Sequence, residues 1–317
     1  MDNQKGSIVV VGSMNVDQIA TCDRFPQDGE TLMGISYAQG FGGKGANQAV
    51  MAARLGADVR FVGQVGDDDL GQATIENFRA HSVDVAGIGM SPGMPSGVAP
   101  IWVDRNGTNR ILVVAGANDD LTGAMVKQRL DAMRLNATSG VSVVVAQLET
   151  PQEATLAAFR LARDRGMITV LNPAPATQIG AELIGATDWL IPNETEFELL
   201  VGCPPSEEAA VTWARTSGCG VVITLGGEGV LVADGANPPW RQPAHAVDVV
   251  DTTGAGDAFV GGFAAGMSSG MSLKDAVTLG GACGALSTTR PGTQVSYPTL
   301  DEVSGLGVPT PQFSKGS

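Results

Sequence analysis

The sequence predicts an α/β protein with a doubly wound, mostly parallel central sheet flanked by helices, and with a small antiparallel β lid. Short apolar runs alternate with amphipathic helical segments along most of the 317 residues. This alternation is the pattern of repeated βαβ units. Two stretches that break it are rich in strand and turn residues, and they predict the lid. We expect one domain over residues 1–304, and a flexible tail over residues 305–317, which are rich in Gly, Pro and Ser.

The central sheet is expected from short apolar runs that share a β-rich composition. These runs cover residues 8–11, 60–62, 141–146, 169–171, 189–191 and 221–225. Amphipathic helices are expected between many of them, at residues 48–55, 70–80, 151–165 and 207–215. Ligands of such sheets bind at the carboxyl ends of the strands. Polar residues that directly follow these runs are therefore the candidates for a functional site.

The lid is expected from residues 17–39 and 97–114, where the strand–helix alternation stops. In the second stretch, two runs of alternating apolar residues flank Asn106-Gly107, and Asn-Gly is a strong β-hairpin signal. The first stretch has the same strand-and-turn character. We expect the two stretches to form one small flap rather than a second domain.

Composition and charge limit the possible partners. Hydrophobic residues make up 43% of the chain and charged residues 16%, which favours a large core over disorder. The net charge of -14 argues against nucleic-acid and membrane-surface partners, which need basic faces. The four cysteines form no C-x-x-C pair, and no run is apolar and long enough to span a membrane. We therefore expect a cytoplasmic protein that binds small molecules.

Residues 251–257 read Asp-Thr-Thr-Gly-Ala-Gly-Asp, and an apolar helical run follows at once. A glycine-rich turn that enters a helix directs backbone N–H groups at one point, and such a site suits an anion, most often phosphate. A carboxylate at its mouth, Asp257, is the base that phosphoryl transfer to an alcohol would need. The alternative is that Asp257 is an acidic N-cap on an ordinary core helix, and this motif alone fits both interpretations.

Two further motifs offer polar groups to a ligand. Asn15 and Asp17 follow the first strand two residues apart, so both project to one side of an extended segment, and their groups suit neighbouring sugar hydroxyls. An Asx-type turn is the alternative there. Residues 40–49 form a glycine-rich turn into a helix that offers Lys44 and Asn47. Its G-x-G-x-x-G pattern does not follow the first strand, so it is a weak dinucleotide-binding signal.

Successive strand ends also carry carboxylate or amide groups. Glu149, Asn172 and Asn193 each follow a different expected strand, at what should be the same edge of the sheet. Asn193 and Glu196 could hold a Mg²⁺ ion through water. The turn at residues 224–229 exposes backbone suited to a nucleotide, although an ordinary β-turn would look the same.

Taken together, these motifs resemble the ribokinase-like (PfkB-type) carbohydrate kinases, from Gly12 to about Pro298. The matching segments are residues 12–17, 42–49, 172–176, 192–196 and 251–257. The Gly-Gly-Lys-Gly-Ala-Asn-Gln form at 42–48 is more typical of the family's ribose kinases than of its adenosine or fructose kinases. The resemblance implies ATP-dependent phosphorylation of D-ribose at the 5-hydroxyl, with Mg²⁺. It also implies a homodimer formed through the lid.

The resemblance implies a role for each matching residue. Asp257 would be the base, and the backbone amides of Gly254, Ala255 and Gly256 would form the anion hole. The sugar would be bound by Asn15, Asp17, Gly43, Lys44, Asn47, Glu149 and Asp257. The nucleotide and its Mg²⁺ would be bound by Asn193, Glu196, Thr224, Leu225, Gly226, Gly227, Glu228, Gly229 and Gly256. A monovalent activator, usually K⁺, would be held by Asp251, Thr253, Ser287, Arg290, Gly292 and Ser296.

Three other functions remain open at this point. The nearest is a kinase for another pentose or a nucleoside, with 2-deoxyribose or adenosine as substrate. A non-catalytic sugar-binding regulator is more distant, because such a protein should have lost Asp257 or the glycines before it. An NAD-dependent oxidoreductase is disfavoured by the position of the glycine motif.

Overall fold

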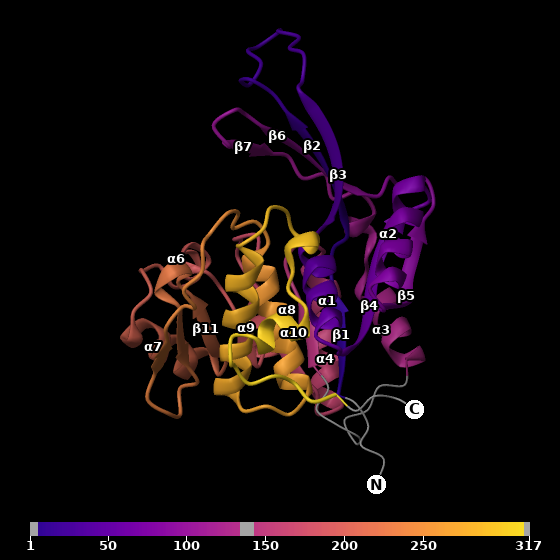
Figure 1. Ribbon diagram of the computed structural model, residues 1–317. Helices are drawn as coiled ribbons and strands as arrows, with labels where there is room; N and C mark the ends of the chain where they lie inside the picture. Colours follow the sequence, from indigo (N-terminus) through magenta and orange to yellow (C-terminus); the bar gives the residue numbers. More distant parts are fainter. Residues whose placement is uncertain (1–5, 134–142, 314–317) are drawn as a thin grey trace.

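The computed structural model describes residues 6–133 and 143–313, and it confirms the predicted fold class. A central sheet lies between two layers of helices, and a second, smaller sheet projects from one end of this body (Figure 1). No helix in the described ranges is both long and apolar enough to cross a lipid bilayer.

The central sheet has nine strands in the order β13-β12-β11-β10-β9-β8-β1-β4-β5. All neighbours from β5 to β11 are parallel, and β12 and β13 add an antiparallel edge. The strands are β1 (Ser7–Val11), β4 (Asp58–Gly66), β5 (Asp84–Ser91), β8 (Val143–Ala146), β9 (Ile168–Leu171), β10 (Trp189–Leu190), β11 (Gly220–Thr224), β12 (Val230–Ala233) and β13 (Trp240–Gln242). Each expected strand is present, although residues 141 and 142 lie outside the described ranges. β5, β12 and β13 were not predicted.

Helices cover both faces of this sheet, and side chains alternate between the two apolar layers. Ile8 and Val10 of β1 join the cluster on one face, while Val9 and Val11 join the other. The first face is covered by α1 (Lys44–Arg54), α2 (Asp69–Ala80), α8 (Ala255–Ser268), α9 (Leu273–Ser287) and α10 (Leu300–Ser304). The second is covered by α3 (Gly123–Ala132), α4 (Gln152–Asp164), α5 (Ala181–Gly185), α6 (Glu194–Val201) and α7 (Glu207–Ser217). Burial on both faces explains why these strands are continuous apolar runs in the sequence.

The projecting sheet is the predicted lid. Its strands are β3 (Ser36–Gly42), β2 (Asn15–Thr21), β6 (Gly97–Val103) and β7 (Asn109–Ile111), in that order. The β6–β7 pair is the predicted hairpin, and β2–β3 is also antiparallel. The central pair β2–β6 is parallel. These two strands run the same way because each continues outward from the body, after β1 and β5 respectively.

The C-terminal segment lies against the body. Val308 and Phe313, within the stretch expected to be a flexible tail, pack against the apolar cluster of the first face. Residues 314–317 of that expected tail lie outside the described ranges. The apolar side chains of this stretch therefore contribute to the core despite its content of Gly, Pro and Ser.

Candidate active site

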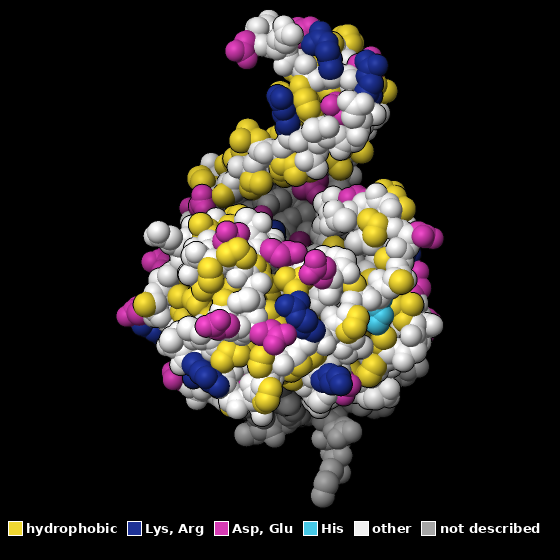
Figure 2. All heavy atoms as spheres, turned by 90° about the vertical axis from the view of Figure 1, so that its left-hand side faces the viewer, with side chains coloured by type: hydrophobic (Ala, Val, Ile, Leu, Met, Phe, Trp, Pro, Cys, Tyr) yellow, Lys and Arg dark blue, Asp and Glu magenta, His cyan; other side chains and the backbone are white. Residues whose placement is uncertain are grey.

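The candidate site is a cleft at the carboxyl ends of the parallel strands. The chain passes outward from β1 to β4 and β5, then returns to β8 and continues in the opposite direction, so the order of the strands reverses at β1. Open α/β sheets bind ligands at such a point. Figure 2 shows the lid overhanging a hollow in the body. The cleft encloses about 180 Å³ and is lined by Lys44, Asn172, Ala174, Ile191, Asn193, Glu196, Thr224, Gly254, Gly256, Asp257 and Val260.

Asp257 lies in the first turn of α8 and is only 7% exposed. Its Oδ2 accepts a hydrogen bond from Nδ2 of Asn47 at 2.9 Å, and its Oδ1 accepts one from Nε2 of Gln48 at 3.0 Å. α8 can approach α1 this closely because residue 261 is glycine: a Cβ there would lie 2.7 Å from the carbonyl oxygen of Gln48. The carboxylate is therefore buried, held through both oxygens, and part of the cleft wall.

The start of α8 has the features of an anion site. Gly254 precedes the helix with φ of 76°, a conformation that favours glycine, and a Cβ there would lie 2.9 Å from the Tyr297 hydroxyl oxygen. No side chain caps the helix. Uncapped backbone amides at a helix start can bind an anion. Of the three expected donors, the Ala255 amide already donates to the Thr252 carbonyl at 3.2 Å, so it is partly engaged in this structure.

Lys44 brings a positive charge into this acidic cleft. Burial by itself would lower the pKa of its ammonium group. The attraction of three carboxylates, Asp257, Glu149 and Glu196, outweighs burial and raises that pKa above its usual value. Lys44 therefore stays protonated, and it can offset negative charge on a ligand.

The expected sugar-binding residues meet where the lid joins the body. Oε2 of Glu149 accepts hydrogen bonds from Oγ of Ser13 at 2.6 Å and from the backbone N of Lys44 at 2.9 Å. Residue 43 must be glycine at this junction, because its φ is 88° and a Cβ would lie 2.7 Å from the backbone N of Asn15.

Asn15 and Asp17 extend this group onto β2. Asn15 is 4% exposed, and its Oδ1 accepts a hydrogen bond from Nδ2 of Asn118 at 2.9 Å. Burial, with the nearby negative charge of Glu149, raises the pKa of Asp17 to about 6. A Cβ at residue 42 would lie 2.6 Å from both carboxylate oxygens of Asp17. The Asp17 carboxylate therefore packs directly against the backbone of Gly42, where no larger residue would fit.

Four of the expected nucleotide-binding residues line the cleft: Gly256 at the start of α8, and Asn193, Glu196 and Thr224. Asn193 caps α6: its Oδ1 accepts from the backbone N of Glu196 at 2.8 Å, and Oε2 of Glu196 accepts from the backbone N of Asn193 at 2.9 Å. Burial raises the pKa of Glu196, although that hydrogen bond from Asn193 opposes the shift. Residues 225–229 form the turn after β11 but do not line the cleft.

The residues expected to hold a monovalent cation lie around the start of α8 and the end of α9. Ser287 is the last residue of α9, and Ser296 lies in a short 3-10 helix. Oδ1 of Asp251 accepts from the backbone N of Thr253 at 2.9 Å, and its Oδ2 accepts from the backbone N of Gly292 at 2.9 Å. The Thr253 hydroxyl also donates to Oδ1 of Asp251, at 2.6 Å, and this bond together with the two backbone bonds outweighs the effect of burial and lowers the pKa of Asp251. The Arg290 side chain instead forms an ion pair with Glu302 at 3.0 Å. The side-chain hydroxyls of Ser287 and Ser296 donate to local carbonyls.

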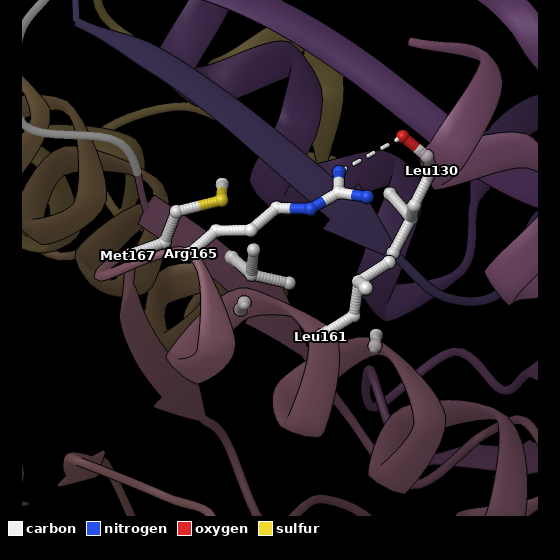
Figure 3. A pocket seen from close by; sticks show the side chains of 7 residues that line it. Leu130, Leu161, Arg165 and Met167 are labelled. Atoms are coloured by element: carbon white, nitrogen blue, oxygen red, sulfur yellow. Dashed lines mark hydrogen bonds between the residues drawn. The ribbon is translucent and has the colours of Figure 1, made fainter. Parts of the chain in front are cut away.

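A second hollow, on the opposite face of the sheet, offers little to a ligand. It is lined by Leu130, Leu161, Met167, Arg165 and neighbouring aliphatic side chains (Figure 3). The Arg165 guanidinium donates to the Leu130 carbonyl at 3.2 Å. The hollow encloses essentially no free volume, so the cleft beneath the lid is the candidate site.

Sequence reasoning named no role for several buried amides around Asp257. Gln48, Gln147 and Asn172 are at most 7% exposed and are joined by hydrogen bonds. Gln48 belongs to the glycine-rich motif, and the other two residues directly follow strands. Those positions were visible in the sequence, but their connection to Asp257 through Gln48 depends on how α1 and α8 pack.

Comparison with known proteins agrees with this geometry. A model of the pfkB family carbohydrate kinases matches residues 5–300. The ribokinase of Staphylococcus aureus is 38% identical over 94% of this chain and 98% of its own length. A deoxyribokinase of Salmonella typhi is 34% identical, covering 93% of this chain and 96% of its own.

The solved structures include an Arabidopsis thaliana ribokinase complexed with ribose and ATP. It superimposes with a TM-score of 0.86 at 30% identity, over 96% of this chain and 99% of its own. The match extends over both the central sheet and the lid, since so little of either chain is left out. This chain therefore belongs to the pfkB family of carbohydrate kinases.

Proposed function

We propose that this protein transfers the γ-phosphoryl group of ATP to the 5-hydroxyl of D-ribose, giving D-ribose 5-phosphate. The observation that carries this proposal is a buried carboxylate, Asp257, in the first turn of an uncapped helix that opens on a cleft. The likeness to a ribokinase from Staphylococcus aureus and to a ribokinase complexed with ribose and ATP supports the choice of substrates. Residues 1–304, with the lid, act as one catalytic unit in this proposal.

Asp257 acts as the base. It receives the proton of the sugar hydroxyl while the phosphoryl group moves in line. An ordinary carboxylate is a weak base toward a free alcohol, but in a loose transition state the proton moves late, and the carboxylate mainly orients the nucleophile. The backbone amides of residues 254–256 face the phosphoryl oxygens, where negative charge must be stabilised. The Ala255 amide must exchange its present hydrogen bond to contribute.

The sugar lies between the lid and α1, bound by Asn15, Asp17, Gly43, Lys44, Asn47 and Glu149. These residues offer the mixture of donors and acceptors that neighbouring hydroxyls require. ATP lies along Asn193, Glu196 and the turn at 224–229. Closure of the lid over both substrates would exclude water from the phosphoryl group.

Two cations complete the proposal, and the residues present fit both. Asn193 and Glu196 line the cleft and carry side-chain oxygen atoms, which suits Mg²⁺ held mainly by water and phosphate, where it would neutralise phosphate charge. Within residues 6–133 and 143–313, no group of three or more His, Cys, Asp or Glu offers a protein-only metal site. The loops joined by Asp251 fit K⁺. Oxygen atoms are offered there by Thr253, Ser287, Arg290, Gly292 and Ser296, in the case of Arg290 and Gly292 by the backbone carbonyl. K⁺ would add positive charge near α8.

The lid supports the proposal of a homodimer. Its exposed apolar side chains include Tyr37 (62% exposed), Trp102 (45%) and Ile111 (52%), and hydrophobic side chains gather on the lid in Figure 2. Apolar surface of this kind marks an interaction site. A second copy of the lid is the partner that we propose. The cytoplasmic location stays a prediction from the sequence.

A coupled assay of ADP formation tests the proposed substrate. Ribose, 2-deoxyribose and adenosine are compared by kcat/KM, with and without K⁺. Ribose should give the highest value, with K⁺ increasing it. The deoxyribokinase relative makes 2-deoxyribose the second candidate. A higher kcat/KM for 2-deoxyribose or adenosine would reject ribose as the substrate while leaving the kinase assignment in place.

A further inference from the structure

We infer that Gln48 is a positioning residue for Asp257, holding the carboxylate in the orientation in which it acts as the base. This inference rests on the proposed phosphoryl transfer, and it adds a residue outside the sugar and nucleotide contacts. Gln48 lies early in α1, is 1% exposed and does not line the cleft. Any effect on the reaction must therefore pass through its neighbours.

Every polar atom of the Gln48 side chain has a partner. Its Nε2 donates to Oδ1 of Asp257 at 3.0 Å and to Oδ1 of Asn172 at 3.1 Å. Its Oε1 accepts from Nε2 of Gln147 at 2.5 Å. A glutamine amide has two protons to donate, and both are used here. The side chain has one arrangement that satisfies all of these groups.

The backbone of the sheet fixes which end of Gln48 faces Asp257. Nδ2 of Asn172 donates to the carbonyl of Ile191 at 2.8 Å. A carbonyl can only accept, so Asn172 must present its nitrogen to Ile191 and its oxygen to Gln48. Gln48 must then present its nitrogen to that oxygen. The remaining proton on the same nitrogen points to the carboxylate.

The result is a carboxylate held on both sides. Gln48 holds Oδ1 and Asn47 holds Oδ2, so the plane of the carboxylate cannot turn without breaking a buried hydrogen bond. Each oxygen keeps a second lone pair for the proton of the sugar hydroxyl. Asn47 is also expected to contact the sugar. Gln48 is the partner whose removal tests orientation separately from sugar binding.

The first test is Gln48→Met, which keeps the length and burial of the side chain and removes both donors. We expect kcat to fall about tenfold to a hundredfold, because a slightly misplaced base is costly, while KM for sugar and ATP changes less than about threefold. Gln64→Met is the matched control. Gln64 is 3% exposed and donates to Oγ of Ser91 at 2.8 Å, on β4 and outside the cleft. Gln64→Met should lower Tm and leave kcat unchanged.

The second test is Gln48→Glu, followed over pH. A protonated carboxyl can donate the same bond to Asp257, whereas an ionised one repels it. The rate relative to the unmodified enzyme should therefore rise as pH falls, which a purely structural role would not produce. A normal kcat in Gln48→Met, or an equal loss in Gln64→Met, overturns the inference. If Gln48→Met does not fold, a pH-independent relative rate for Gln48→Glu is by itself sufficient to overturn the inference.

All rates are measured with the sugar that the unmodified enzyme phosphorylates fastest. Failure to use ribose then contradicts the proposed function and leaves the test of Gln48 intact. Conversely, an active ribose kinase that is unaffected by Gln48→Met contradicts only this inference.

Discussion

The two sheets of this molecule differ in how far neighbouring helices bury their faces. The central sheet has helices on both faces, so the side chains of β1 alternate between two apolar clusters. Among the described residues, no α-helix covers either face of the lid sheet (Figure 1). The face that carries Asn15 and Asp17 continues outward as Ile19, next to Ile101 and Ile111 on neighbouring strands.

This difference separates two tasks. The body completes its own core and can hold a carboxylate in a fixed position. The lid leaves Ile111 and Tyr37 more than half exposed, which is costly unless something covers them. We therefore expect substitutions in the body to change the chemical step, and substitutions in the lid to change assembly and sugar affinity.

The largest effect is expected from Asp257→Asn in the body. Without a base, kcat should fall about a thousandfold or more, since the amide cannot accept the proton. Ribose should still bind, because its other contacts remain. Steady-state rate measurements give kcat, and calorimetry gives the ribose Kd.

Asp257→Asn also tests whether the body and the lid have separate tasks. Because the lid is unchanged, sedimentation should give the same oligomeric state as for the unmodified protein. Retention of most of the turnover would remove Asp257 from the mechanism.

A smaller effect is expected from the lid variant Ile101→Ser with Ile111→Ser. The two residues are directly paired across β6 and β7, so the substitutions make one apolar row polar. We expect the proposed dimer to dissociate and the KM for ribose to rise about tenfold, with a kcat within about threefold of the unmodified enzyme. Sedimentation velocity and steady-state kinetics measure these changes.

Leu199→Ser is the matched control for the lid variant. Leu199 is 54% exposed on α6, in the body. It should leave both the oligomeric state and KM unchanged. A lid variant that remains dimeric would rule out the lid as the contact.

The smallest effect is expected at the junction, where Asp17 joins the lid to the body. The pKa of Asp17 is raised from 3.8 to about 6 in the folded protein. Folding thus favours the protonated form, and the resulting stability is present at low pH and lost as pH rises through about 6. Asp17→Asn should therefore raise Tm above that pH, and the gain should disappear at low pH.

Sugar binding at this residue should depend on pH in the opposite sense. The carboxylate is the better hydrogen-bond acceptor, so the affinity of the unmodified enzyme for ribose should fall as pH drops below about 6. Asp17→Asn should bind ribose weakly at every pH. A pH-independent ribose Kd in the unmodified protein would exclude Asp17 from the sugar site.

The sequence could predict the body because its signals are local. The predicted strands β1, β4, β8, β9, β10 and β11 contain short apolar runs, and the predicted helices between them have apolar faces. β5 was missed because Gly87 and Gly89 interrupt its run, and both stand where a Cβ would collide with neighbouring atoms. The parallel pairing of β2 with β6 was missed because it joins distant segments, which no local pattern records.

The site was predictable to the extent that its residues lie in short motifs. Asp257, Lys44 and Asn193 all line one cleft, and Asn193, which follows β10, does so as the strand-end rule predicts. The role of Gln48 was not predictable, because it depends on the close approach of α1 and α8 at Gly261. The capping function of Glu196 depends likewise on its burial and on its contact with Asn193.

The hydrogen bond from Asn47 to Asp257 joins residues 210 positions apart in the chain. An N-terminal fragment that ends before α8 would contain most of the expected sugar contacts but neither the proposed base nor the helix start. During synthesis on the ribosome, an incomplete chain would therefore consume no ATP. Activity would begin only after α8, which ends at residue 268 of 317, has emerged and docked onto α1.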